Sequence, residues 1–130
     1  MRKVLQPQSL PDPRPRYSQG ILAEGNRLLF IAGQTGVDAD GNVVGKGDAA
    51  AQAEQVLKNM KAVLDEAGAS FADLVKITTY ITDPRYRDDI NPARLKYMGD
   101  NPPSSTLVVC AGLANPDFLV EIEAIAVLPD

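Results

Sequence analysis

The stretch Val120-Glu-Ile-Glu-Ala-Ile-Ala-Val127, near the end of the chain, has the pattern of a β-strand rich in apolar residues. Successive side chains of a strand point to opposite faces, so Glu121 and Glu123 share one face with Ile125 and lie about 7 Å apart. Two explanations fit two carboxylates on so apolar a strand. Either the strand lies near an edge of its sheet, where both are solvated or ion-paired, or one of them serves a functional site.

Other stretches of the chain predict further strands around this one. Leu74–Ile81 and residues 107–110 carry apolar side chains on both faces, which is typical of central strands. Val37–Val43 is typical of a hairpin with Asp40-Gly41 as its turn, and the proline-rich Pro7–Pro15 predicts an extended loop. In chain order, the predicted strands are a short one near residues 2–6, a buried one at Leu28–Ala32, then Leu74–Ile81, 105–111 and 118–127.

Two regions predict helices. The first begins after Asp48, a good N-terminal cap, and ends before Gly68, which suits a left-handed C-terminal position. Its apolar residues recur at helical spacing, opposite charged ones: Ala53, Val56, Leu57, Met60, Leu64 and Ala67. The second region starts with Asp83-Pro84 as cap and first turn. A proline inside a helix removes a hydrogen bond, so we expect a break at Asn91-Pro92 and a new helix from there to about Met98.

These elements together predict one α+β domain over residues 1–130, built on a mixed sheet. Two helices can cover one face of such a sheet but not both. The other face would be a large apolar patch on a single chain, so we expect a homo-oligomer.

The composition narrows the function classes. The 130 residues include 13 basic and 17 acidic side chains, for a net charge of −4, and no run of Lys or Arg predicts a nucleic-acid partner. The chain contains no His, which excludes Ser-His-Asp and Cys-His catalysis and removes the commonest metal ligand. We therefore expect neither a metal nor a cofactor. Catalysis would have to use Tyr, carboxylates, Arg or Lys, hydroxyls, one thiol and backbone amides.

The expected location follows from the same sequence. The single cysteine, Cys110, cannot form an internal disulfide, suits a reducing compartment and is expected to be buried and inert. The first residues lack the apolar stretch of a signal peptide, and no apolar run is long enough to span a membrane. We expect a cytoplasmic protein with no membrane partner.

Four motifs give the chain a resemblance to a known family. They are Tyr17-Ser-Gln-Gly-Ile21, Ile31-Ala-Gly-Gln34, Asn101-Pro-Pro-Ser-Ser-Thr-Leu-Val-Val-Cys110 and Val120–Val127. Together they resemble the RidA (YjgF) family of small trimeric enamine/imine deaminases, over nearly the whole chain. The resemblance implies a RidA/chorismate-mutase-like fold. It also implies a trimer with a barrel-like centre, helices outside and ligand clefts between subunits.

The resemblance also implies site residues. Glu121 matches the glutamate that positions the attacking water, and Tyr17 matches a tyrosine that lines the cleft. Gly33 matches a glycine whose backbone approaches the ligand, and Thr106 matches a position that contributes a backbone group. Ser104 stands where active members carry the arginine that grips the substrate carboxylate.

Losing that arginine matters, because a hydroxyl cannot replace a fork of two charge-assisted hydrogen bonds. At about 1.5–3 kcal/mol each, the loss amounts to about 100-fold or more in affinity for an anionic substrate. Either the cleft accepts a neutral or differently shaped ligand, or another cation takes over. Arg87 is the candidate cation, with Arg94 and Lys96 weaker, although Arg87 also fits a solvated position on a helix.

Three functions remain open at this point. The first is a deaminase-like hydrolase that acts on an enamine, imine or related C–N bond and uses Glu121 to activate water. Alternatively, the chain is a trimer that binds a small metabolite without turnover, or a hydrolase of a different small molecule.

Overall fold

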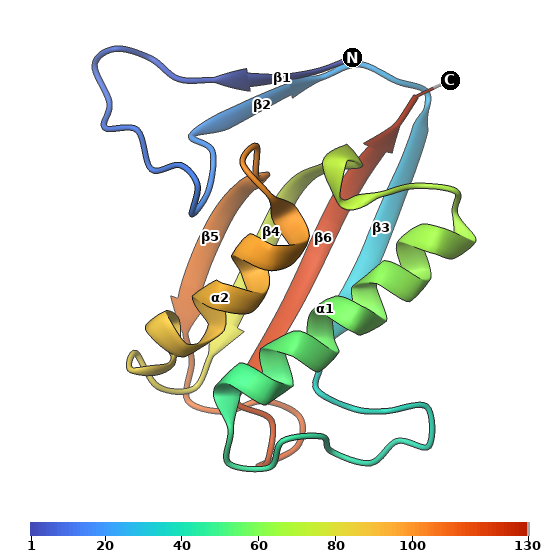
Figure 1. Ribbon diagram of the computed structural model, residues 1–130, viewed down its shortest axis with the longest axis vertical. Helices are drawn as coiled ribbons and strands as arrows, with labels where there is room; N and C mark the ends of the chain where they lie inside the picture. The colour runs from blue at the N-terminus through green and yellow to red at the C-terminus, as the bar shows by residue number, and fades with distance from the viewer. Residues whose placement is uncertain (130) are drawn as a thin grey trace.

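A mixed four-stranded β-sheet carries both long helices on one of its faces in the computed structural model, which describes residues 1–129 (Figure 1). The elements of this layer pair are β3 (Arg27–Gln34), α1 (Ala49–Glu66), a short 3-10 turn η1 (Phe71–Asp73), β4 (Leu74–Ile81), α2 (Tyr86–Met98), β5 (Ser104–Val109) and β6 (Val120–Leu128). The strand order is β3-β6-β4-β5. Two shorter strands, β1 (Arg2–Leu5) and β2 (Gly20–Ala23), form a separate antiparallel pair. The predicted α+β class is confirmed.

The order of the strands corrects one prediction. β4 runs antiparallel to β6 and parallel to β5, and α2 makes the crossover that parallel neighbours require. The prediction that residues 107–110 form a central strand is wrong. β5 pairs with β4 on one side and with no strand of the four-stranded sheet on the other, so its apolar residues lie at an edge within the described chain. The two central strands are β6 and β4.

The first helix has the ends that the sequence predicts. The Asp48 side chain accepts a hydrogen bond from the backbone N–H of Ala51 at 3.0 Å, and Gly68 has a φ of +71° just beyond the last turn. Its apolar stripe is fully buried at Val56, Leu57 and Met60. Neither α1 nor any other helix of residues 1–129 has the length and hydropathy needed to cross a bilayer.

The buried amide of Gln52, on α1, holds together two loops at the base of the sheet. It donates to the carbonyls of Gly45 (3.2 Å) and Asp117 (2.9 Å) and accepts from the N–H of Leu119 at 2.9 Å. A buried amide stabilises a fold when its donors and acceptors are satisfied in this way. The contact fixes the chain just before β6 begins.

The second helix is continuous, contrary to the prediction of a break at Pro92. It begins at Tyr86 and includes Pro92 in its interior, whereas Asp83 makes a turn before the helix by accepting a hydrogen bond from the N–H of Arg85 at 2.9 Å. Pro92 itself is exposed, and the buried face of the helix, which includes Ile90, packs against the sheet. Tertiary packing therefore outweighs the lost hydrogen bond of one proline.

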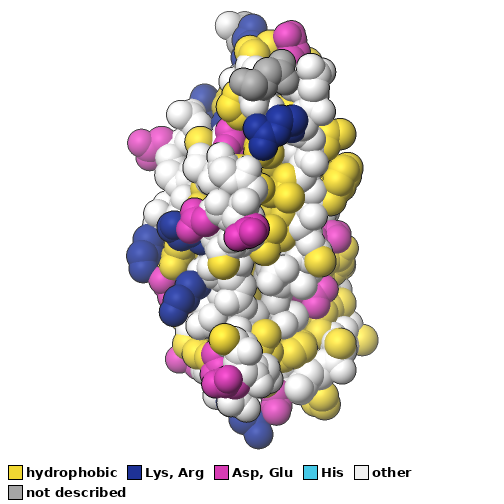
Figure 2. Space-filling view, turned by 90° about the vertical axis from the view of Figure 1, so that its right-hand side faces the viewer, with side chains coloured by type: hydrophobic (Ala, Val, Ile, Leu, Met, Phe, Trp, Pro, Cys, Tyr) yellow, Lys and Arg dark blue, Asp and Glu magenta, His cyan; other side chains and the backbone are white. Residues whose placement is uncertain are grey.

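The helix-free face of the sheet exposes large apolar side chains. Leu28 and Phe30 on β3 are 59% and 69% exposed, whereas Ile31, on the helix side of the same strand, is buried. The predicted strand at Leu28–Ala32 is therefore present, but its expected burial is wrong for a single chain. Figure 2, in which this face lies to the right, has hydrophobic side chains along that side.

We expect Leu57→Ala to lower the free energy of unfolding by about 2–5 kcal/mol, because it leaves a cavity in a site of 0% exposure. The measurement is urea unfolding followed by circular dichroism at a fixed protein concentration. Lys58→Ala, one residue further on the exposed face of α1, is the control and should change stability by less than about 0.5 kcal/mol. Equal losses in the two variants would contradict the helix orientation described above.

Candidate functional site

Glu121 lies on the helix-free face of the sheet, over the bare backbone of Gly33. β3 has one extra residue between Ile31 and Gln34 relative to β6, and this bulge contains Gly33. A Cβ atom added to Gly33 would lie 2.5 Å from Oε2 of Glu121 and 2.7 Å from its Cδ. The glycine is thus required for the observed position of the carboxylate.

The place of Glu121 in the sheet tests the edge-strand explanation of its charge. β6 is a central strand between β3 and β4, so the explanation from an edge strand is wrong. Glu121 is half-buried, and no Lys or Arg within residues 1–129 is ion-paired with it. Its carboxylate is available to a ligand or to water.

Glu123, two residues further on the same face, has a different environment. It is exposed and accepts a hydrogen bond of 2.9 Å from the hydroxyl of Tyr80 on β4. This hydrogen bond is the main cause that raises the pKa of Tyr80. Of the two glutamates, Glu123 is hydrogen-bonded to Tyr80, whereas Glu121 has no ion-pair partner within residues 1–129.

Tyr17 and Arg87, predicted from separate parts of the sequence, lie in one pocket of about 240 Å³ beside the edge strand β5. Helix α2 supplies Arg87, Asn91 and Arg94, which share a helix face because they are spaced by four and three residues. The complete lining is Arg16, Tyr17, Arg87, Asn91, Arg94, Ser105 and Leu107. The pocket is rich in nitrogen donors and contains no acidic side chain.

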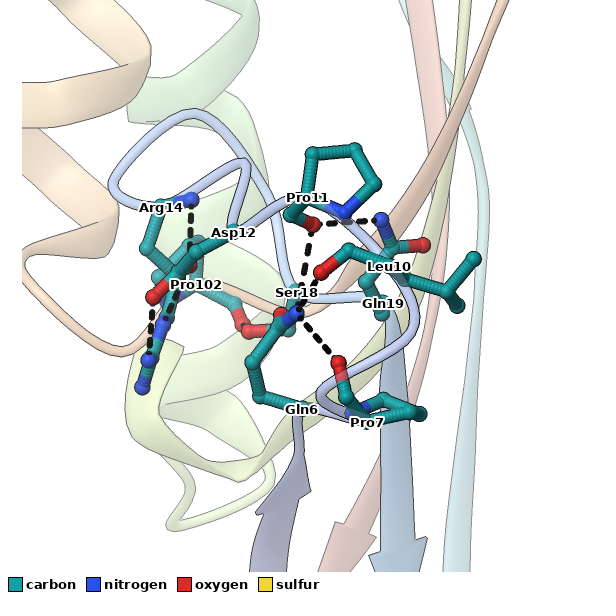
Figure 3. A network of polar contacts seen from close by, with 9 residues as sticks. All are labelled: Gln6, Pro7, Leu10, Pro11, Asp12, Arg14, Ser18, Gln19 and Pro102. Carbon is teal, nitrogen blue, oxygen red and sulfur yellow. Dashed lines mark hydrogen bonds and ion pairs between the residues drawn. The ribbon is translucent and has the colours of Figure 1, made fainter.

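The loop that carries Arg16 and Tyr17 is held by polar contacts to its own backbone (Figure 3). The side-chain amide of Gln6 donates to the carbonyls of Pro7, Leu10 and Pro11 at 3.2, 3.0 and 3.2 Å. Arg14 forms an ion pair with Asp12, and its hydrogen bond lowers the pKa of that carboxyl to about 2. Residues 7–15 form the predicted loop, but it is not extended throughout, because the N–H of Leu10 donates to the carbonyl of Pro7 (3.2 Å) and that of Arg16 to the carbonyl of Pro13 (3.0 Å) in two turns.

The same loop is fastened to the start of β5. The Ser18 hydroxyl donates to the carbonyl of Pro102, and the N–H of Ser18 donates to the carbonyl of Pro103 at 3.1 Å. Ser18 is buried and forms an isolated bridge with Ser104. The position of Tyr17 relative to the pocket is therefore set by a contact between segments far apart in the sequence.

Arg94 is the most buried charged side chain of the pocket, with 8% exposure. One of its terminal nitrogens, Nη2, donates to the carbonyl of Arg16 (3.3 Å) and to the hydroxyl of Ser105 (3.2 Å), while its Nε has no hydrogen-bond partner. Burial lowers the pKa of Arg94, and the positive charges of Arg16 and Arg87 lower it further.

The remaining predicted residues lie outside this pocket. Ser104 donates its hydroxyl to the carbonyl of Val75 at 2.6 Å, and Thr106 is exposed and accepts a hydrogen bond of 2.7 Å from Lys76. Lys96, one of the two weaker candidate cations, is ion-paired with Glu54 at 2.7 Å. Cys110, expected to be buried, is only half-buried.

The structure thus brings the predicted residues together in two separate groups. Gly33 and Glu121 lie on the helix-free face, whereas Tyr17 and Arg87 line the pocket formed by α2, β5 and the N-terminal loop. The prediction from sequence missed Arg16, Asn91 and Ser105 and gave Arg94 little weight. The helical spacing from Arg87 to Arg94 was a signal that could have linked those two.

Metal binding gains no support from the side chains. Among residues 1–129, no group of three or more Cys, Asp or Glu side chains is placed to hold a metal ion.

Comparison with known proteins agrees with the motifs of the sequence. A sequence model of the family described as Endoribonuclease L-PSP matches residues 7–128. The chain is 40% identical over 126 residues to a RutC family protein of Pyrococcus horikoshii, and the aligned region covers 97% of this chain and 98% of that protein.

Solved structures agree as well. The fold is similar to the crystal structure of the Rid family protein YyfB from Yersinia pestis, with a TM-score of 0.91, 37% identity and 98% of each chain covered. It is also similar to RidA from the Antarctic bacterium Psychrobacter sp., with a TM-score of 0.73, 29% identity and coverage of 97% of this chain and 99% of that chain. The chain belongs to the RidA (YjgF) family.

Proposed function

We propose that the protein hydrolyses an enamine, imine or related C–N bond of a small metabolite, in clefts between the subunits of a homotrimer. The observation that carries this proposal is the half-buried carboxylate of Glu121, which is held over Gly33 and has no ion-pair partner among residues 1–129. A carboxylate with no cation beside it is free to accept a proton from water, which is the task of a general base. Membership of the RidA family supports the reaction class.

In the proposed reaction, Glu121 accepts a proton from a water molecule while the water oxygen forms a bond to the imine carbon. The electron pair of the C=N bond moves to nitrogen, which takes up that proton from Glu121, and a neutral tetrahedral carbinolamine results. Glu121, ionised again, then accepts the hydroxyl proton as the carbonyl forms, and passes it to the amine nitrogen as the C–N bond breaks. The products are a ketone or keto acid and ammonia, and Glu121 ends in its starting form.

The location of the cleft is part of the proposal. In one chain, Glu121 lies on the helix-free face of β6, whereas the pocket around Tyr17 is lined by α2 and by the edge strand β5. A ring of three chains would place the helix-free face of one sheet against the edge of the next. We propose that this arrangement closes the cleft around a metabolite.

RNA is not the substrate that we propose, although the matching family is described as an endoribonuclease. The net charge of −4 opposes binding of a polyanion, and the chain has no His to act as general base in phosphodiester cleavage. The pocket of about 240 Å³ favours a small ligand.

We expect Glu121→Gln to lower kcat/KM by about 100-fold or more, because an amide cannot take up the proton of water. The assay would generate 2-imino acids in situ with an amino-acid oxidase and follow the loss of semicarbazide-trapped imine. Glu123→Gln is the matched control, since Glu123 lies on the same face with a partner in Tyr80, and it should retain nearly the full rate. No turnover by the unaltered protein, or equal losses in both variants, would contradict the proposed function.

A second substitution tests whether the position of the Glu121 carboxylate over Gly33 matters for the reaction. Gly33→Ala would place a methyl group 2.5 Å from the present position of Oε2, so the flexible side chain of Glu121 must move away. We expect kcat to fall by about 100-fold, as for an ångström-scale misplacement of a catalytic group, with an unchanged unfolding midpoint.

Gly112→Ala serves as the control for this substitution, because an added Cβ there meets no atom within 4 Å. It should leave both rate and stability unchanged. Full activity in Gly33→Ala would show that the position of Glu121 over the glycine is unimportant.

A further inference from the structure

Three arginines surround the pocket beside β5. Arg16 comes from the N-terminal loop, and Arg87 and Arg94 come from one face of α2. A guanidinium keeps its proton in proteins and presents only donors, so the three together give the pocket a strong positive charge. The other lining groups, such as Asn91, Tyr17 and Ser105, are neutral.

None of these three arginines is ion-paired with an acidic side chain of residues 1–129. Two other arginines of the chain show the contrast. Arg14 is paired with Asp12 at 2.5 Å, and Arg85, directly before α2, is paired with Asp83 at 2.8 Å. The positive charge of the pocket is therefore not neutralised within the described chain.

Arg94 makes this arrangement costly to the free protein. It is only 8% exposed, its Nε has no hydrogen-bond partner among residues 1–129, and the positive charges of Arg16 and Arg87 oppose its own. A buried charge is retained when it is paired, because an isolated one loses its hydration without compensation. No acidic side chain of residues 1–129 is ion-paired with Arg94, so the negative charge has to come from a ligand or from a neighbouring copy.

We infer that Arg16, Arg87 and Arg94 form a binding site for a small metabolite dianion, carrying two carboxylates or a phosphate. The pocket of about 240 Å³ is the size of a short dicarboxylate or phosphate ester rather than a polymer. Arg94 gives the buried end of the site, and the exposed Arg16 and Arg87 close over the second charge. Asn91 and Ser105 add neutral hydrogen-bonding groups.

This inference deepens the proposed function, because it names the substrate class of the same cleft, namely imines that carry a second anionic group. The hydroxyl of Ser104 is engaged by Val75 and cannot grip a carboxylate, which leaves the arginine pocket as the anion-binding part of the cleft. Anion binding can be measured without turnover. The inference and the proposed function can therefore fail separately.

The test is isothermal titration calorimetry of the full chain at constant ionic strength, in a buffer free of sulfate and phosphate. The probes are sodium succinate, sodium phosphate and the monoanion sodium propionate. We expect a dianion to bind at least about tenfold more tightly than propionate, since each additional charge-assisted hydrogen bond is equivalent to about a tenfold change or more. Saturable binding of succinate alone indicates a dicarboxylate ligand, and of phosphate alone a phosphate ester.

Variants assign the binding to the arginines. Arg94→Gln should weaken dianion binding by about tenfold or more, and Arg87→Gln, an exposed position that does not endanger folding, by about threefold to tenfold. Arg85→Gln is the matched control, because Arg85 is an exposed arginine at the same end of α2 but lies outside the pocket. It should leave binding unchanged.

Several results would overturn the inference. They are no saturable heat with either dianion, equal affinity for propionate, or an equal loss in Arg85→Gln and Arg87→Gln. Absence of binding would point instead to a carboxylate of a neighbouring copy as the partner of Arg94. Dianion binding that persists in Glu121→Gln while no imine is turned over would leave the anion site standing and reject the proposed hydrolase.

Discussion

Two helices cover one face of a four-stranded sheet, and this geometric constraint governs the rest of the molecule. α1 and α2 bury a core that includes Leu57 and Ile122 on their side, while Phe30 and Leu28 remain exposed on the opposite face. Apolar area removed from water stabilises a protein by about 25 cal/mol per Å², so such a face favours contact with another copy. We propose that this chain forms a trimer, as the resemblance to the RidA family implies, because neighbouring copies bury the exposed apolar face of the sheet.

The same constraint separates the functional residues. Glu121 projects from the helix-free face, over a glycine that leaves room for it, whereas the arginine pocket opens beside α2 at the β5 edge. Within one chain, the proposed proton acceptor and the proposed anion-binding pocket are therefore too separate to contact the same ligand. A neighbouring copy that covers the apolar face would join a site of one kind to a site of the other, which links assembly to chemistry.

The sequence predicted those features that depend on local patterns. The capping aspartate Asp48, the strand Leu74–Ile81 and the glycine after α1 are where their patterns place them, because caps and periodicity act within a few residues. Predictions failed where distant packing decides. Pro92 stays inside a helix, and the strand of residues 107–110 lies at an edge.

The candidate site follows the same division. Glu121 and Gly33 could be named from sequence motifs. Their contact depends on a bulge in β3, which the local sequence pattern does not predict. Arg94 was undervalued because its contacts come from distant segments: it donates a hydrogen bond of 3.3 Å to the carbonyl of Arg16, which is 78 residues away in sequence. Charge alone cannot tell a buried arginine from a solvated one.

The proposed cleft requires neighbouring copies, so the mass of the protein in solution is the first quantity to measure. Sedimentation equilibrium over a range of protein concentrations would measure it without a ligand or an assay. We predict three times the 13.9 kDa mass of one chain. A mass of one chain at every concentration would contradict it, because Glu121 and the arginine pocket would then never share a ligand.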